Sequence, residues 1–254
     1  MLLSFQEFIR DALLIQRKVF LFDKDGTLTL PNQSLDEAGS FFLSELLKTK
    51  KCILLTARDF KTISEQILGK LPEDTLHQNL IFGCSNGSEI YEWSHGKEYK
   101  KVSSLPGNIQ AYLPDIQKGV DSINKQNQIH ITIEPRSDTM IALVCIPRDS
   151  SKEERENFDP NKKKRNSYGD ILKGFFPSGE IIPGGSTTID VSLCTKYDGL
   201  IHLYKYYHFG SSDAIYFGDN FGEYGNDAPI LSDQIPAVNI DTVEELFTLT
   251  HYAK

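Results

Sequence analysis

The chain has 254 residues, which is enough for one large domain or for a core domain that carries a smaller insert. Its net charge of −8 excludes a protein that holds nucleic acid through a broad basic surface, but not one with a local phosphate site. No stretch of about 18 apolar residues predicts a membrane span. The apolar N-terminal stretch is interrupted by Glu7, Arg10 and Asp11, so we expect an amphipathic helix there, no signal peptide, and a cytoplasmic protein. The four scattered cysteines show no metal-binding spacing and are expected to be reduced and buried.

Short apolar runs alternate with helical patterns in the first third of the chain. Lys18–Phe22 predicts a buried strand, and Ser34 with Glu37 forms a capping box that predicts a helix through Lys48. A second strand, a second helix and a third strand are predicted at Cys52–Leu55, Phe60–Leu68 and Leu80–Phe82. This alternation predicts an α/β fold with a parallel sheet and right-handed crossovers.

The pattern changes after the third strand and returns near Tyr197. The elements predicted between these points are hairpins over Ser88–Val102 and Ile129–Ile146, a helix over Ile109–Asn124, a charged helix from the capping box of Ser151 and Glu154 toward Phe175, and strands near Glu180 and Thr187. From Tyr197 onward we expect a helix that ends at Tyr207, strands at Ala214–Phe217 and Ala237–Ile240, and a helix over Val243–Thr250. The sequence therefore predicts a core made of residues 1–90 and 193–254, with an α+β cap inserted over residues 91–192.

Two acidic segments follow predicted strands directly. Asp23 and Asp25 come after the strand that ends at Phe22, and strand alternation would place them on one side, with Lys24 on the other. Asp219 and Asp227 follow the strand that ends at Phe217. Because ligands bind at the carboxyl ends of strands in open α/β sheets, the two segments are expected to face each other. Clustered carboxylates need a cation, and an oxygen-rich site suits Mg²⁺.

Four segments together resemble the motifs of the haloacid dehalogenase superfamily. They are Phe22-Asp23-Lys24-Asp25-Gly26-Thr27-Leu28-Thr29, the strand-end Thr56, Thr195-Lys196-Tyr197, and Gly218-Asp219-Asn220 with Gly225-Asn226-Asp227. The chain also looks like eukaryotic-type phosphomannomutases over nearly its whole length, through Ser85-Asn86-Gly87, Glu153–Phe158 (EERENF) and Gly184–Val191 (GGSTTIDV). The resemblance implies a Rossmann-like core, a parallel sheet flanked by helices, with an inserted large α/β cap.

The same resemblance implies an enzyme that works through an aspartyl-phosphate. Asp23 would be the nucleophile and Asp25 the general acid/base, while Lys196 and Thr56 would hold the transferring phosphoryl group. Mg²⁺ would bind Asp23, the backbone carbonyl of Asp25, Asp219 and Asp227. The family's substrate contacts in the cap correspond to Arg136, Arg148, Arg155, Thr188 and Asp190.

These roles predict a phosphomannomutase-like isomerase of GDP-mannose biosynthesis that converts mannose 6-phosphate to mannose 1-phosphate. A hexose bisphosphate would activate it, and the resemblance implies a homodimer through the cap. Two departures from the family favour an alternative, a sugar-phosphate phosphatase: Pro31-Asn32 stands where the family has an arginine, and Thr56-Ala57-Arg58 resembles the T-G-R motif of such phosphatases. Arg58 is a candidate to replace the lost phosphate contact. A non-catalytic phosphosugar-binding protein is a weaker alternative, because binding needs no nucleophile.

Two further features have weaker interpretations. We expect the basic run Lys162–Arg165 to form a solvated helix face, and only secondarily a localisation signal or an anion-binding patch. Asp233 falls where the resemblance places a second, structural cation.

Overall fold

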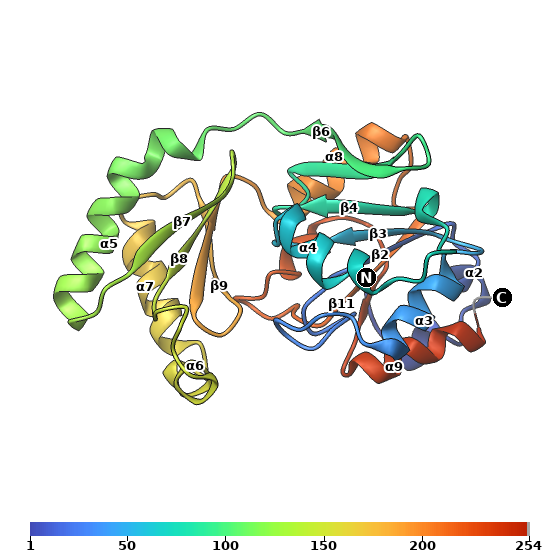
Figure 1. Cartoon of the computed structure of the whole chain (residues 1–254), viewed down its shortest axis with the longest axis horizontal. Helices are drawn as coiled ribbons and strands as arrows, with labels where there is room; N and C mark the ends of the chain where they lie inside the picture. The colour runs from blue at the N-terminus through green and yellow to red at the C-terminus, as the bar shows by residue number, and fades with distance from the viewer. Residues whose placement is uncertain (253–254) are drawn as a thin grey trace. The chain divides into compact units, whose positions relative to one another are not determined.

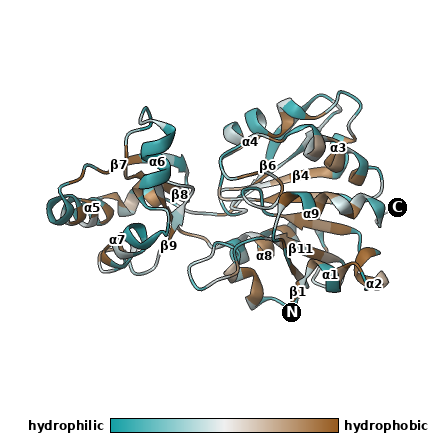
Figure 2. Cartoon of the chain, turned by 90° about the horizontal axis from the view of Figure 1, so that it is seen from below, coloured by the Kyte–Doolittle hydropathy of each residue, from teal (hydrophilic) through white to brown (hydrophobic). Residues whose placement is uncertain are grey.

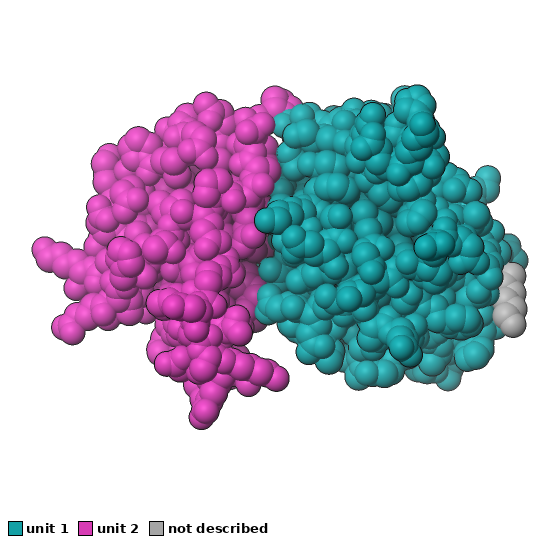
Figure 3. Space-filling model, in the orientation of Figure 1, with its two compact units in different colours: residues 1–105, 196–254 teal, residues 106–195 magenta. Residues whose placement is uncertain are grey.

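The chain contains two compact units in the computed structural model, which describes residues 1–252 (Figures 1 and 3). Unit 1 comprises Met1–Leu105 and the chain from Lys196 onward. Unit 2 comprises Pro106–Thr195. No helix within the described residues is long and apolar enough to cross a membrane.

Unit 1 is built on an eight-stranded sheet in the order β1-β12-β11-β2-β3-β4-β5-β6. The pairs from β1 to β4 are parallel, and β5 and β6 add an antiparallel hairpin at one edge. Its strands are β1 (Leu2–Ser4), β2 (Val19–Phe22), β3 (Lys51–Leu55), β4 (Leu80–Cys84), β5 (Glu89–Ser94), β6 (Glu98–Ser104), β11 (Ala214–Gly218) and β12 (Ala237–Asn239).

Helices cover both faces of this sheet. The α-helices are α1 (Phe5–Phe8), α2 (Ala12–Ile15), α3 (Glu37–Leu46), α4 (Phe60–Gln66), α8 (Lys196–Tyr207) and α9 (Val243–Phe247). The 3₁₀ turns are η1 (Leu68–Lys70), η2 (His77–Asn79), η4 (Ala228–Ser232) and η5 (Thr248–His251). Helices α1, α3, α4 and α9 share one apolar cluster with the sheet, and α8 and η4 share another on the opposite face.

The alternation of side chains along β2 explains why the sheet has helices on both sides. Phe20 and Phe22 belong to the cluster of α1 and α3, whereas Val19 and Leu21 belong to the cluster of α8. Burying each such side chain contributes about 1.5–3 kcal/mol of transfer free energy. The central strands β4 and β11 are accordingly brown, and the helices are mixed in colour, in Figure 2. These observations confirm the predicted α/β core.

Unit 2 is an antiparallel sheet with helices on one face. Its sheet order is β7-β8-β10-β9, and α5 and α7 pack on it through a shared apolar cluster. The elements are η3 (Ile109–Tyr112), α5 (Leu113–Asn127), β7 (Thr132–Ser137), β8 (Met140–Val144), α6 (Lys152–Phe158), α7 (Lys163–Lys173), β9 (Glu180–Gly184) and β10 (Thr188–Ser192). The predicted α+β insert is therefore present.

The boundaries of the insert differ from those expected at residues 91 and 192. Residue 91 lies inside β5, and the hairpin of β5 and β6 continues the sheet of unit 1 through the pairing of β4 with β5. Along the chain, the boundaries between the two compact units fall instead between Leu105 and Pro106 and between Thr195 and Lys196. The local pattern of residues 88–102 predicts a hairpin, but it does not specify which sheet the hairpin joins.

Several local expectations are corrected by the structure. Met1–Leu14 is not one amphipathic helix, because its first residues pair with β12 as strand β1 and the Asp11 side chain caps α2. Helix α3 is capped by Asp36, which accepts a hydrogen bond from the Gly39 amide, and not by Ser34. The capping box of Ser151 and Glu154 is confirmed, although its helix ends at Phe158 and a second helix begins at Lys163.

The run Lys162–Arg165 is not uniformly solvated as expected. Its last residue, Arg165, is 1% exposed and pairs with Asp159, with 3.1 Å between Nε and Oδ2. The Arg165 guanidinium also donates to the backbone carbonyls of Gly184, Gly185 and Thr188. Arg165 therefore ties α7 to the connection between β9 and β10.

Candidate active site

Asp23 is the first residue after β2 and lies almost fully buried at the carboxyl end of the sheet. Its backbone amide continues the ladder with β11 by donating to the Phe217 carbonyl at 2.9 Å. Its Oδ1 accepts a hydrogen bond from the Lys196 ammonium at 2.6 Å. Its Oδ2 is buried and has no hydrogen-bond partner within residues 1–252. Leaving such an oxygen unsatisfied is costly, so this atom is suited to a ligand.

Asp23, Asp219 and Asp227 form a cluster in which one oxygen of each carboxylate lies within 4.8 Å of the others. Asp219 approaches the first acidic segment closely because residue 26 is a glycine. Gly26 has φ +95°, and a Cβ atom there would lie 2.3 Å from Asp219 Oδ2. The two segments, nearly 200 residues apart in the sequence, are therefore brought together as expected.

The charge of this cluster favours a divalent cation. Three carboxylates face one ammonium, that of Lys196, which lies 2.6 Å from both Asp23 and Asp227. Burial, reinforced by Asp227 and Asp219, raises the pKa of Asp23 to about 7, although Lys196 opposes the shift. Burial would lower the pKa of Lys196, but the carboxylates of Asp227 and Asp23 outweigh it and raise that pKa. The oxygen-only ligands, the excess negative charge and the unpartnered Asp23 oxygen all fit Mg²⁺.

Lys196 is placed by a close approach between α8 and the end of β4. A Cβ atom at Gly199 would lie 1.9 Å from the Asn86 carbonyl oxygen, so only glycine lets the first turn of α8 sit there. Lys196 is the first residue of α8 and is 1% exposed. Thr56 follows β3, the strand next to β2, and is also buried. The predicted Lys196 is thus beside Asp23, and Thr56 is at the same edge of the sheet.

Asp25 belongs to a separate ion network. Its Oδ2 accepts from Arg58 Nε at 2.7 Å and its Oδ1 from Lys24 Nζ at 2.9 Å. Arg58 Nη2 also donates to Asn32 Oδ1 at 2.7 Å, and the Asn32 amide donates to Asp25. Burial would raise the pKa of Asp25, but Arg58 and Lys24 outweigh it and lower that pKa. The expected separation of Lys24 from Asp25 is wrong, because the chain leaves strand geometry after Phe22 and turns at Gly26.

The arginines predicted to bind substrate in unit 2 are partly engaged with a carboxylate. Arg148 forms two hydrogen bonds to Glu134, at 3.1 and 2.6 Å, and Arg136 lies 3.8 Å from the same carboxylate. The bonds from Arg148 lower the pKa of Glu134. Arg155 is exposed in the last turn of α6. Glu134 is therefore an additional member of this group that the sequence analysis did not single out.

Thr188 and Asp190, the other predicted substrate residues, are on β10. The Thr188 hydroxyl donates to the Gly184 carbonyl at 2.6 Å. Asp190 and Glu134 both pair with Ala142 of β8, from its two sides. Because they share this register position, Asp190 and Glu134 belong to the same face of the sheet.

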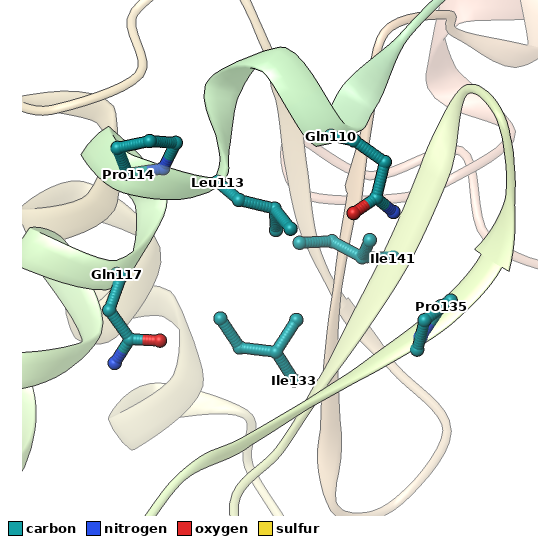
Figure 4. A pocket seen from close by; sticks show the side chains of 7 residues that line it. All are labelled: Gln110, Leu113, Pro114, Gln117, Ile133, Pro135 and Ile141. Atoms are coloured by element: carbon teal, nitrogen blue, oxygen red, sulfur yellow. The ribbon is translucent and has the colours of Figure 1, made fainter.

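Two pockets differ in the charge of their lining residues, which matters for the binding of a phosphorylated ligand. The pocket of Figure 4 is between α5 and strands β7 and β8, and its lining, which includes Leu113, Ile133 and Ile141, has no charged side chain. A second pocket is lined by Gly26, Asp219 and residues 239–244 of unit 1. This second pocket is next to the acidic cluster and is the better candidate to open onto the site.

One polar residue near Asp23 could not be found from motifs. Tyr216, inside β11, is fully buried and donates to Asp227 Oδ1 at 2.5 Å. Tyr216 lies within the apolar run that predicts the strand, so the sequence analysis treated it only as part of that strand. The only signal in the sequence is a hydroxyl group in an otherwise apolar segment.

Comparisons with known proteins agree with the observed fold. No family model matches the chain. The chain is 29% identical to a probable phosphomannomutase of Caenorhabditis elegans over 240 residues, which are 86% of this chain and 87% of that protein. It is 26% identical to a phosphomannomutase of Spinacia oleracea over 223 residues, covering 85% and 87% of the two chains. The sequence is therefore phosphomannomutase-like over most of its length.

Solved structures agree with the observed fold. An IMP-bound, N-terminally truncated IMP-nucleotidase of Plasmodium falciparum aligns with a TM-score of 0.70 at 16% identity, covering 97% of this chain and 71% of that one. The C-terminal domain of a Candida albicans trehalose-6-phosphate phosphatase aligns with a TM-score of 0.63 at 13% identity, covering 98% of both chains. At these identities the likeness shows the fold alone. The core with an inserted cap, as expected, is the fold of this phosphomannomutase-like chain.

Proposed function

We propose that the protein is a magnesium-dependent phosphotransferase that interconverts mannose 6-phosphate and mannose 1-phosphate through a phosphorylated Asp23. The observation that carries the proposal is the state of the Asp23 carboxylate. One of its oxygens is held by Lys196, and the other is buried without a partner in the described chain, next to two more carboxylates. The similarity to two phosphomannomutases supports the choice of sugar.

The residues present suffice for a balanced transfer. Asp23 attacks the phosphorus atom, the bond from phosphorus to the sugar oxygen breaks, and Asp25 gives that oxygen the proton that it took from a sugar hydroxyl in the preceding half-reaction. In the other half, a free hydroxyl of a hexose monophosphate gives its proton to Asp25 and takes the phosphoryl group from Asp23, which yields the hexose bisphosphate that is the intermediate of the mutase reaction. Lys196 and Thr56 are proposed to hold the phosphoryl oxygens. Asp23, Asp219, Asp227 and the carbonyl of Asp25 would hold Mg²⁺, which when bound offsets the negative charge of the phosphoryl group.

The recognition of the rest of the substrate is assigned to unit 2. We propose that Arg136, Arg148 and Arg155 bind a second phosphate, and that Thr188 and Asp190 bind sugar hydroxyls. Arg155→Ala should then lower kcat/KM for the mutase reaction by roughly ten- to a hundredfold, the cost of one charge-assisted hydrogen bond. Hydrolysis of p-nitrophenyl phosphate, which has no second phosphate, should be nearly unchanged. A cytoplasmic homodimer through unit 2, with a hexose bisphosphate as activator, completes this proposal.

A sugar-phosphate phosphatase is the second candidate, and the position of Arg58 favours it. Arg58 bonds to both Asp25 and Asn32, which supports the proposal that Arg58 replaces the phosphate contact of the arginine that the family has near position 32. In this case water, and not a sugar hydroxyl, would take the phosphoryl group from Asp23.

Product analysis distinguishes the two candidates. Mannose 1-phosphate is incubated with the protein and Mg²⁺, with and without a hexose bisphosphate, and the products are separated. A mutase gives mannose 6-phosphate, with a rate that the bisphosphate raises. Release of inorganic phosphate at ordinary turnover rates without any isomer, even with the bisphosphate present, would show that the phosphatase assignment is correct.

A further inference from the structure

Tyr216 is the one polar side chain of strand β11, whose other residues are alanine, isoleucine, phenylalanine and glycine. It is fully buried within the apolar cluster that α8 shares with the sheet. Phenylalanine would bury the same ring without the cost of desolvating a hydroxyl group. The hydroxyl group therefore needs an explanation in terms of its partners.

Those partners are two residues of the candidate active site. The Tyr216 hydroxyl donates to Asp227 Oδ1 at 2.5 Å and accepts from Lys196 Nζ at 3.1 Å. Lys196 also donates to Asp23 Oδ1 and Asp227 Oδ1, both at 2.6 Å. A lysine ammonium has three N–H donors, so Tyr216, Asp23 and Asp227 account for all of them.

Hydrogen bonds also occupy both oxygens of the Asp227 carboxylate. Its Oδ1 accepts from Tyr216 and Lys196, and its Oδ2 accepts from the backbone amides of Asp219 and Asn220, at 3.2 and 3.1 Å. Both oxygens therefore have two partners. Tyr216 contacts the ammonium and the carboxylate at once, from inside a central strand that cannot move independently of the sheet.

We propose that Tyr216 is a positioning residue for phosphoryl transfer, whose hydroxyl fixes the Lys196 ammonium and the Asp227 carboxylate against Asp23. The inference rests on the proposed function of the site and extends it by one residue. Without the hydroxyl, one Lys196 donor loses its partner and the ammonium can turn away from Asp23 Oδ1. Because such placement matters most where charge develops during the reaction, the effect is expected on kcat more than on KM.

The test compares Tyr216→Phe with a matched control. Tyr207→Phe also removes a phenol–carboxylate hydrogen bond from unit 1, that of Tyr207 to Glu92 at 2.9 Å. In Tyr216→Phe, kcat should fall roughly tenfold with KM nearly unchanged, the loss expected for one net hydrogen bond. The affinity for orthovanadate, which mimics the transferring phosphoryl group, should fall by a similar factor in thermal-shift titrations. Tyr207→Phe should change neither quantity.

A double-mutant cycle shows whether Tyr216 acts through Lys196. In a Lys196→Met background, adding Tyr216→Phe should lower vanadate affinity by clearly less than it does in the wild-type background, because the contribution that passes through the ammonium is already absent. Full additivity of the two losses would overturn the inference. So would a Tyr216→Phe protein that keeps wild-type kcat and vanadate affinity and only melts at a lower temperature. If wild type itself neither binds vanadate nor turns over any phosphate ester, it is the proposed function that fails.

The wild-type protein gives an independent measurement if the variant does not fold. A buried hydroxyl in a short bond to a carboxylate exchanges slowly, so tyrosine labelled at Cζ should show a downfield hydroxyl proton by NMR. This resonance should shift when vanadate and Mg²⁺ are added. A resonance that is absent, or that does not respond to vanadate, would also overturn the inference.

Discussion

Replacing Arg165 by methionine should destabilise unit 2 strongly while leaving unit 1 folded. Methionine keeps an unbranched apolar side chain but removes the guanidinium group. Five hydrogen bonds are lost: one to Asp159 Oδ2, one to the Asp159 carbonyl, and three to carbonyls of residues 184, 185 and 188. The Asp159 carboxylate, which is 5% exposed, would keep only backbone amides as partners.

The magnitude follows from breaking a buried ion pair by removing one partner, which typically costs about 3–5 kcal/mol. Since about 1.4 kcal/mol corresponds to a factor of ten, backbone amides in unit 2 should exchange with deuterium at least roughly a hundredfold faster. The effect should be largest in β9 and β10, whose connection Arg165 holds. Deuterium uptake is measured by mass spectrometry on peptides from the full-length protein, so that exchange in residues 106–195 can be compared with exchange in unit 1.

Lys164→Met is the matched control, because Lys164 is exposed in the same helix and its ammonium contacts the Phe158 carbonyl and ring. A surface change of this kind usually stays within about 0.5 kcal/mol, so exchange should change by no more than roughly twofold. If Arg165→Met exchanges as slowly as Lys164→Met, the structural importance of the buried pair is refuted.

Three further predictions concern the two candidate binding regions. Asp23→Asn should abolish turnover and the formation of a beryllofluoride adduct without unfolding the protein; retained activity would contradict the nucleophile assignment. Asp219→Ala should remove both the Mg²⁺ requirement for activity and the rise in melting temperature on adding Mg²⁺, because a ligand of the folded state stabilises it. Full wild-type activity in EDTA would exclude this metal site. Glu134→Gln should weaken the hold on Arg148 and lower KM for a hexose bisphosphate several-fold, with p-nitrophenyl phosphate hydrolysis unchanged; an unaltered KM would show that Glu134 does not compete for the arginines.

The sequence predicts those parts of the fold whose determinants are local. The strand before Asp23 is predictable because four consecutive apolar residues are buried on both faces and a polar turn follows them. The hairpin after residue 88 is also visible as a pattern. Its place in the larger sheet is not, because pairing between β4 and β5 depends on a backbone edge that no periodicity describes.

The candidate site shows the same limit at the level of single side chains. Asp23 and Asp219 can be identified because each follows a predicted strand in an acidic segment, whereas Lys196 is identified only through the resemblance to the superfamily's motifs. The pairing of Arg58 with Asp25, 33 residues apart, depends on how the chain turns after Phe22 and so cannot be derived from composition or spacing. The burial of Arg165 could not be predicted for a related reason. The sequence does not distinguish it from the three lysines before it, and only the folded helix α7 shows that Arg165 is buried.

Lys196 is the first residue of unit 1 after the chain returns from unit 2, and this has a consequence for protein engineering. A recombinant chimaera that exchanges the insert has to place its second junction before the residue that contacts Asp23. A junction inside the turn from Lys196 to Gly199 that adds or removes one residue would rotate this turn against Asn86, where no room exists for a side chain at Gly199. Transplanted inserts should therefore succeed only where the native spacing from Lys196 to Gly199 is kept.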